Sequence, residues 1–169
     1  MSMLAPVTSS DPRVAPNNME AEQSTLGGML LSQEAVADVL EVVSGVDFYA
    51  PKHELIFNAV VTLFGRGEPT DVIAVTDYLN KEGNLLKAGG ADYLHSLTSF
   101  VPTAANASYY GKIVADKAIL RRLIDAGTRI AQSGYESQGE VEDLVNQAQS
   151  EIFQVATKST KEDYVGLSE

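Results

Sequence analysis

The residue types that usually carry out enzyme chemistry are few in this sequence, and their spacing is unfavourable. The histidines, His53 and His95, lie in separate predicted helices, and we interpret each as a packed or capping residue rather than a catalytic base. The only Gly-Lys pair, Gly111-Lys112, lacks the upstream glycine and the following Ser or Thr of a phosphate-binding loop. The sequence therefore predicts no catalytic residue and no bound nucleotide cofactor in these 169 residues.

Metal binding has equally little support. The chain contains no cysteine, and its only close pairs of histidine and carboxylate are His53-Glu54 and Asp92 with His95. Neither pair supplies the three protein ligands of a typical zinc site, so we predict no metal. The absence of cysteine suits the reducing cytoplasm, and no apolar run approaches the roughly 18 residues that a membrane span needs. We expect a cytoplasmic protein without a membrane anchor or a secretory signal.

The charge of the chain argues against direct nucleic-acid binding. It has 12 Lys and Arg residues against 23 Asp and Glu residues, a formal net charge of −11 that repels a phosphate backbone and favours basic partners. Tyr109-Tyr110 with Lys112 is the nearest approach to a stacking site, so we expect weak or no binding of single-stranded DNA. We interpret the one basic cluster as a solvated helix face, formed by Lys117, Arg121, Arg122 and Arg129.

Helical periodicity runs through most of the chain, and no segment alternates with a period of two. The sequence predicts an all-α fold in four parts: a disordered segment 1–16, a globular helical head 17–103, a long antiparallel helical hairpin 104–157, and the start of a linker, 158–169. In the head, we expect helix caps at Asn17 with Glu20, at Ser32, and at Thr70 or Asp71. Gly27-Gly28 inside the first helix predicts close approach of a neighbouring helix.

The first helix of the predicted hairpin is apolar on too many sides. An early stripe of Tyr110, Ile113, Val114 and Ala118 can pack on the head, and Leu120, Ile124 and Ala131 continue it. A second stripe contains Ile119, Leu123, Ala126 and Ile130. Together the later residues span roughly 160° of the helix, against about 100° for a helix that covers one core. Because one neighbouring helix cannot cover both stripes, we predict self-association or partner docking.

An ordered set of short motifs covers residues 16–157. It contains Asn17 to Glu22 leading into Leu26-Gly27-Gly28, then Phe48-Tyr49 with His53, Pro69-Thr70-Asp71, Gly89-Gly90 with Tyr93-Leu94, and Tyr110 with Ile113-Val114. This set resembles the N-terminal domain of bacterial replicative hexameric DNA helicases, the DnaB family.

The resemblance implies a non-catalytic collar within a larger enzyme. In that family, head and hairpin form an N-terminal tier whose copies pair through their hairpins, and the dimers assemble into a hexameric ring. The tier surrounds single-stranded DNA and docks the C-terminal domain of primase. A linker joins it to an ATPase motor, which here would lie beyond Glu169 and would use ATP and Mg²⁺ to unwind DNA.

The physical pattern and the resemblance agree on the hairpin as the site of assembly. We predict an oligomer or partner interface that contains Ile119, Leu123, Ala126, Ile130, Ile152 and Phe153. The sequence does not separate contacts with primase from contacts with sister subunits. A free-standing helical adaptor is the alternative function, since primase itself carries a related helical domain. A third is a small helical enzyme, which ATP turnover by the pure chain would reveal.

Overall fold

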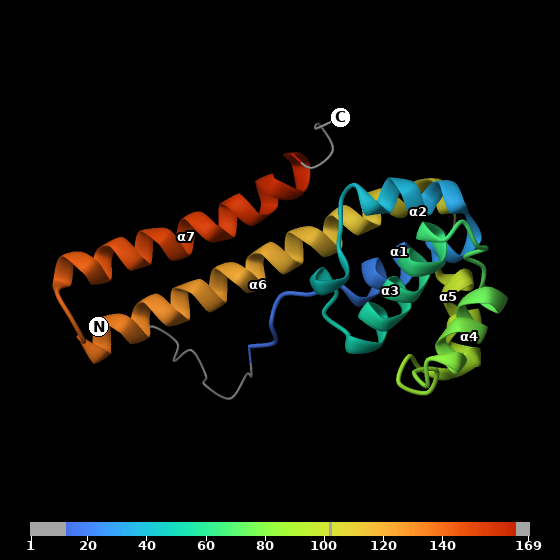
Figure 1. Ribbon diagram of the computed structural model, residues 1–169, viewed down its shortest axis with the longest axis horizontal. Coiled ribbons are helices and arrows are strands. Elements are labelled where there is room, and N and C mark those ends of the chain that lie inside the picture. Colours follow the sequence, from blue (N-terminus) through green and yellow to red (C-terminus); the bar gives the residue numbers. More distant parts are fainter. Residues whose placement is uncertain (1–12, 102, 165–169) are drawn as a thin grey trace, which may run out of the picture.

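The molecule consists of a helical head with a long helical hairpin projecting from it (Figure 1). The computed structural model describes residues 13–101 and 103–164, and every regular element in these ranges is helical. The elements are α1 (Met19–Leu31), α2 (Gln33–Leu40), the 3₁₀ turn η1 (Gly45–Asp47), α3 (Pro51–Gly65), α4 (Val72–Lys81), α5 (Gly90–Phe100), the 3₁₀ turn η2 (Ala104–Asn106), α6 (Ala107–Glu136) and α7 (Val141–Tyr164). The predicted all-α fold, with head and hairpin, is confirmed.

Helix α1 forms the centre of the head, where it contacts α2, α3, α5 and α6. Its Leu26 and Met29 side chains have no exposed surface. A Cβ added to Gly27 would collide with the carbonyl oxygen of Leu97 on α5, and one added to Gly28 would lie 2.6 Å from the Cβ of Ala107 on α6. The predicted close approach at this glycine pair is therefore confirmed. It explains why α1 tolerates two residues that cost about 1 kcal/mol each relative to alanine.

Side chains cap the helices at or near the predicted positions. The Ser32 hydroxyl accepts the N–H of Ala35 at 3.3 Å, and the Asp71 carboxylate accepts that of Ala74 at 2.9 Å. Asp71, rather than Thr70, is thus the cap of α4. Both side chains satisfy backbone donors that the first turn of a helix leaves without a partner.

The first helix begins one residue later than the predicted capping box. The side chain of Asn18 accepts the N–H of Ala21 at 3.0 Å, whereas the amide of Asn17 donates to the carbonyl of Ala15 at 2.9 Å. Two adjacent asparagines can each cap a helix, so composition alone did not separate them. The cap is the residue with extended φ and ψ directly before the first helical turn, and that residue is Asn18.

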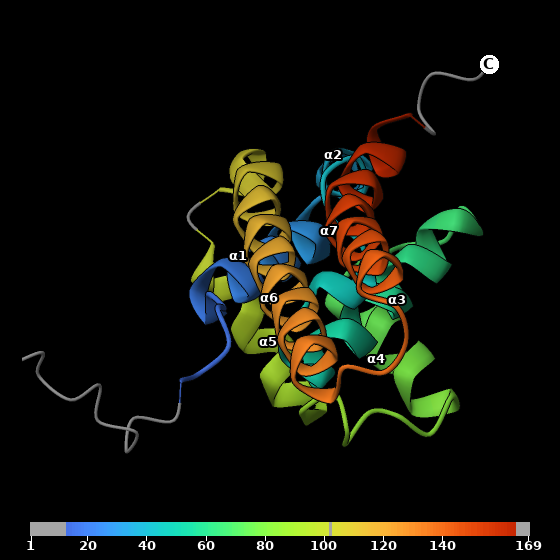
Figure 2. The ribbon, with the colours of Figure 1, turned by 90° about the vertical axis from the view of Figure 1, so that its left-hand side faces the viewer.

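A tight turn joins the two helices of the hairpin, which run antiparallel (Figures 1 and 2). Ser137 and Gly139 adopt positive φ angles of 49° and 105°, which reverse the chain. Helix α7 continues to Tyr164, past the expected end at Thr157. The physical reason is that residues 158–164 include Lys and Glu, which favour helix, and contain neither Gly nor Pro.

The first described residues lie against α6 of the hairpin. Residues 13–16, which we expected to be disordered, lie beside α6, where Arg121 donates to the carbonyl of Pro16 at 2.7 Å. Residues 1–12, the rest of the segment predicted to be disordered, are outside the described residues, as are residues 165–169 of the expected linker.

Candidate functional site

The buried histidine of the head belongs to a hydrogen-bonded network centred on Glu22. His53 Nδ1 lies 2.8 Å from the Glu22 carboxylate, and its Nε2 is hydrogen-bonded to the hydroxyl of Tyr93. The same carboxylate accepts the backbone N–H groups of Tyr49 at 2.9 Å and Ala50 at 3.2 Å. Glu22 therefore ties α1 to the start of α3 and, through His53, to α5. The prediction that His53 is a packed residue is confirmed.

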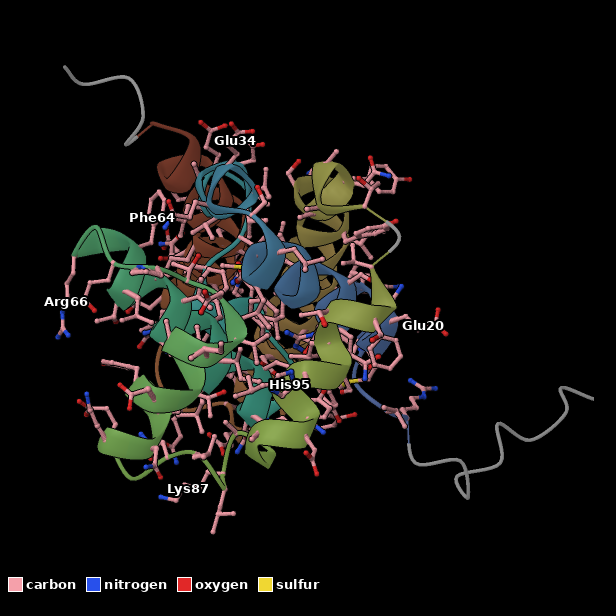
Figure 3. The ribbon with its side chains drawn as sticks, turned by 90° about the vertical axis from the view of Figure 1, so that its right-hand side faces the viewer. Glu20, Glu34, Phe64, Arg66, Lys87 and His95 are labelled. Carbon is pink, nitrogen blue, oxygen red and sulfur yellow. The ribbon has the colours of Figure 1, made fainter. Side chains whose placement is uncertain are left out.

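The second histidine has no such surroundings. His95 lies exposed on α5 at the surface of the head, so the prediction of a packed or capping role is wrong for this residue (Figure 3). Within residues 13–101 and 103–164, no three His, Asp or Glu side chains are placed to hold a metal ion. No helix in the same ranges is both long enough and apolar enough to cross a bilayer.

Two consecutive arginines fasten the hairpin to the head. Arg121 donates to the carbonyls of Pro16 at 2.7 Å and Asp47 at 2.6 Å. Arg122 pairs with the buried carboxylate of Asp47 at 3.1 Å, and that carboxylate also accepts the N–H of Ser44 at 3.0 Å. The interpretation of these arginines as a solvated face is therefore wrong, because they bind backbone and carboxylate oxygens of the η1 region. These bonds fix the angle at which α6 leaves the head.

The seam between α6 and α7 contains small and aliphatic residues together with one ion pair. Ala126 is fully buried, and Leu144 and Ala148 of α7 are half-buried. Arg129 donates to both carboxylate oxygens of Glu151 at 2.8–3.1 Å. This seam uses only one side of each helix.

An apolar surface remains open along one side of the hairpin. Counting about 100° per residue, Leu123 lies about 60° round α6 from the buried Ala126, and Ile152 about 80° round α7 from Leu144. In antiparallel helices, equal rotations in the same sense lead to the same side of the pair. Leu123 and Ile152 are 48% and 54% exposed, and Val145, close to Ile152 on the helical wheel, is 52% exposed. We call this side, defined by Leu123, Val141, Val145 and Ile152, the front of the hairpin.

The DnaB-like helicase N-terminal domain family matches residues 14–116, which is more than half of the chain. The chain belongs to this family. The "Replicative DNA helicase DnaB" of Leifsonia xyli is 62% identical over 160 residues, covering 95% of this chain and 35% of the relative. The "Replicative DNA helicase DnaC" of Bacillus subtilis is 43% identical over 157 residues, covering 93% and 35%. The chain thus spans about a third of the length of these relatives.

A solved structure matches most of this chain. The crystal structure of the N-terminal domain of DnaB helicase from Mycobacterium tuberculosis is 54% identical, with a TM-score of 0.79, and the match covers 84% of this chain and 99% of that one. This likeness confirms that the chain is a DnaB N-terminal domain and that its fold is all-helical.

Four of the six predicted interface residues of this DnaB-type domain lie on or beside the front. Leu123 and Ile152 are exposed there, and Ile119 and Ile130 are half-buried at its edge. Val141 and Val145 are exposed and belong to the front as well, because the seam covers only part of the apolar stripe of α7.

The other two predicted interface residues lie elsewhere. Ala126 is fully buried between the helices of its own hairpin, so it does not belong to an intermolecular surface. Its small side chain lets α6 and α7 approach each other. It falls in the same stripe as Leu123 because the seam and the front are neighbouring parts of the surface of α6. Phe153 is exposed, but it lies about 180° round α7 from Leu144 at about 100° per residue, on the outer side of that helix.

The ion pair in the hairpin seam should respond to acid. The hydrogen bonds from Arg129, aided by its positive charge, hold the pKa of Glu151 below its ordinary value. A carboxylate with a lowered folded-state pKa stabilises the fold above its unfolded pKa, near 4.3, and this stabilisation is lost as the pH falls through the folded pKa. We expect an NMR titration to place the Glu151 midpoint below that of an ordinary glutamate, and Arg129→Gln to restore it. A midpoint at or above the ordinary value would contradict the pairing.

Proposed function

We propose that this DnaB-type domain is the non-catalytic collar of a replicative DNA helicase, which assembles through its hairpin into a ring and docks primase. The observation that carries the proposal is the exposed front of the hairpin. Leu123, Val145 and Ile152 are aliphatic side chains near half exposure on two helices of one chain. A contiguous apolar surface of this kind is typical of a protein–protein interface.

A second copy of the chain is the partner that best fits the front. The surface has few charges, and it extends along two parallel stripes on rigid helices, so two copies can pair face to face about a twofold axis. Burying one Leu or Ile side chain is worth about 1.5–3 kcal/mol. Several such side chains on each copy are enough to offset the entropy lost on association. Pairs of this kind are the units from which we propose that a hexameric ring is built.

The acidic balance of the domain supports docking of a basic partner. With a formal net charge of −11, the domain attracts basic surfaces over a distance of several ångströms. We propose the C-terminal domain of primase as that partner. Single-stranded DNA would pass through the assembled ring rather than bind tightly to one copy.

The motor functions belong to the full-length protein in this proposal. The relatives are replicative helicases about three times as long as this chain, since it covers 35% of two of them. We propose that ATP and Mg²⁺ act in a motor domain joined to α7 by the linker. A free-standing helical adaptor is the second candidate in this proposal, and the names of the relatives, which describe helicases, support it less.

Calorimetric titration tests the docking part of the proposal. The C-terminal domain of primase from the same source is titrated into the 169-residue domain, and we expect saturable binding that weakens as salt is raised. A matched titration into Leu123→Asp/Ile152→Asp shows whether primase needs paired hairpins. If no heat of binding and no complex is found at any salt concentration, the docking proposal is wrong. The assembly proposal is tested separately, by the mass of the domain in solution.

A further inference from the structure

The charge of the hairpin reverses along its length. From residue 107 to 129, α6 carries two carboxylates and five basic residues, which are Lys112, Lys117, Arg121, Arg122 and Arg129. From residue 130 to 157 the chain has no Lys or Arg and carries five carboxylates, which are Glu136, Glu140, Glu142, Asp143 and Glu151. We call residues 107–129, the part of α6 beside the head, the root, and residues 132–143 the tip. The root is basic and the tip is acidic.

The root contains a groove between the first described residues, the η1 turn and α6. Its volume is about 510 Å³. Arginine and aliphatic side chains dominate its lining, with Asp125 as its one carboxylate, and the residues that matter here are Arg13, Val14, Val46, Arg121, Arg122 and Ile124. Val46 is 63% exposed, and Val14 and Ile124 are also exposed. A groove of this composition fits an acidic segment that also carries apolar side chains.

The groove faces away from the front of the hairpin. Counting about 100° per residue, its α6 residues Arg121 and Asp125 lie about 140° and 100° from Ala126, in the sense opposite to Leu123. Figure 2, which looks along the hairpin, shows the first described residues on the side of α6 away from α7. The groove therefore stays open when a second copy covers the front.

The tip offers matching chemistry on that same side. By the same count of about 100° per residue, Glu136 lies about 80° from Ala126 and Asp143 about 100° from Leu144, both in the sense opposite to the front. Tyr135 beside them is 91% exposed, and Gln132 donates to the Glu136 carboxylate at 2.9 Å. An exposed aromatic ring among carboxylates is complementary to aliphatic side chains rimmed by arginines.

We propose that the arginine groove at the root is a second self-association site, which receives the acidic tip of another copy. The contact is reciprocal. In an antiparallel arrangement each tip meets the other root, whereas a parallel one sets acid against acid. Ile124 and Tyr135 are separated by about 16 Å along α6 at about 1.5 Å per residue, so the twofold axis passes between them. The site rests on the proposed function in one respect: front pairing alone gives dimers, and a closed ring needs a second, different contact.

Cysteine cross-linking tests the contact directly, because the chain contains no cysteine of its own. Val46→Cys places one thiol in the groove, and Gln132→Cys places one beside the tip while leaving Tyr135 and Glu136 intact. With a short bis-maleimide, we expect covalent dimers when the two variants are mixed and few when either is treated alone. Ile73→Cys, on the exposed surface of α4, replaces Val46→Cys in the control mixture. No cross-link above this control, or equal cross-linking of Gln132→Cys alone, would overturn the proposal.

A charge exchange shows whether arginine and carboxylate recognition holds the tip in place. Arg13→Glu and Glu136→Lys should each reduce the cross-linking yield several-fold, and mixing chains that carry both changes should restore it. A yield unaffected by either change would count against the groove.

The Leu123→Asp/Ile152→Asp variant distinguishes the groove contact from the front contact. The cross-link between groove and tip should persist in this variant, since the groove lies on the other side of the hairpin. If the front does not pair copies, the variant will have the same mass in solution as the wild-type chain.

Discussion

Replacing Glu22 with alanine is expected to lower the free energy of unfolding by about 3–5 kcal/mol, the usual cost of breaking a buried charged network by removing one partner. Glu22 is 1% exposed, and its carboxylate accepts the N–H groups of Tyr49 and Ala50 and the Nδ1–H of His53. The variant removes the acceptor of all three donors, and those of Ala50 and His53 are buried. Urea unfolding followed by far-UV circular dichroism, at equal protein concentrations, measures the change.

A control on the same helix turn isolates the network. Glu20 also lies in the first turn of α1, but its side chain is exposed. Glu20→Ala should change stability by no more than about 0.5–1 kcal/mol, through the helix dipole. Glu22→Gln keeps one acceptor oxygen and should fall between the two. A Glu22→Ala loss no larger than that of Glu20→Ala would show that the network does not hold the head together.

Replacing Leu123 and Ile152 with aspartate should separate paired copies while leaving the helices intact. Each aliphatic side chain is worth about 1.5 kcal/mol or more on burial, and 1.4 kcal/mol corresponds to a factor of ten in affinity. Two substitutions should therefore weaken association by about 100-fold or more. Light scattering reports the mass, and circular dichroism reports the helix content.

Leu123 and Ile152 are better positions for this test than the half-buried Ile130, because substitution of Ile130 would also disturb the hairpin itself. The matched control is Ile73→Asp/Leu86→Asp, which alters two aliphatic side chains that are 77% and 89% exposed on the head. That control should retain the wild-type mass. Equal loss of mass in both variants would mean that added charge, not the front, causes dissociation, and an unchanged mass in the hairpin variant would remove the front as an interface.

Local features of this fold follow closely from sequence. Ser32 and Asp71 cap helices as predicted. A short polar side chain directly before a run of helical periodicity can accept a backbone N–H of the first turn, so the cap is visible in the local sequence. Gly27 and Gly28 predicted close packing because two glycines inside a helix need compensation, and the contacts with Leu97 and Ala107 provide it. The apolar arc of α6 is wider than one neighbouring helix can cover, and this width likewise predicted an exposed apolar surface.

Features that depend on contacts distant in sequence were missed. In the sequence, Glu22 has the position of an ordinary acidic residue in a first helical turn. The residues around it do not indicate that its carboxylate contacts His53. Arg121 and Arg122 read as a solvated face because their acceptors lie at residues 16 and 47. The buried Ala126 was included among the predicted interface residues for a related reason. Periodicity places Ala126 and Leu123 in one stripe, and only the position of α7 decides which of them is covered.

Sedimentation equilibrium of the unaltered chain tests the central claim most directly. If the hairpin front joins copies, the measured mass will exceed the 18.1 kDa of one chain and rise with concentration towards a multiple of two chains. A mass of 18.1 kDa at every concentration, up to about 100-fold above a dissociation constant of about 1 µM, would contradict it.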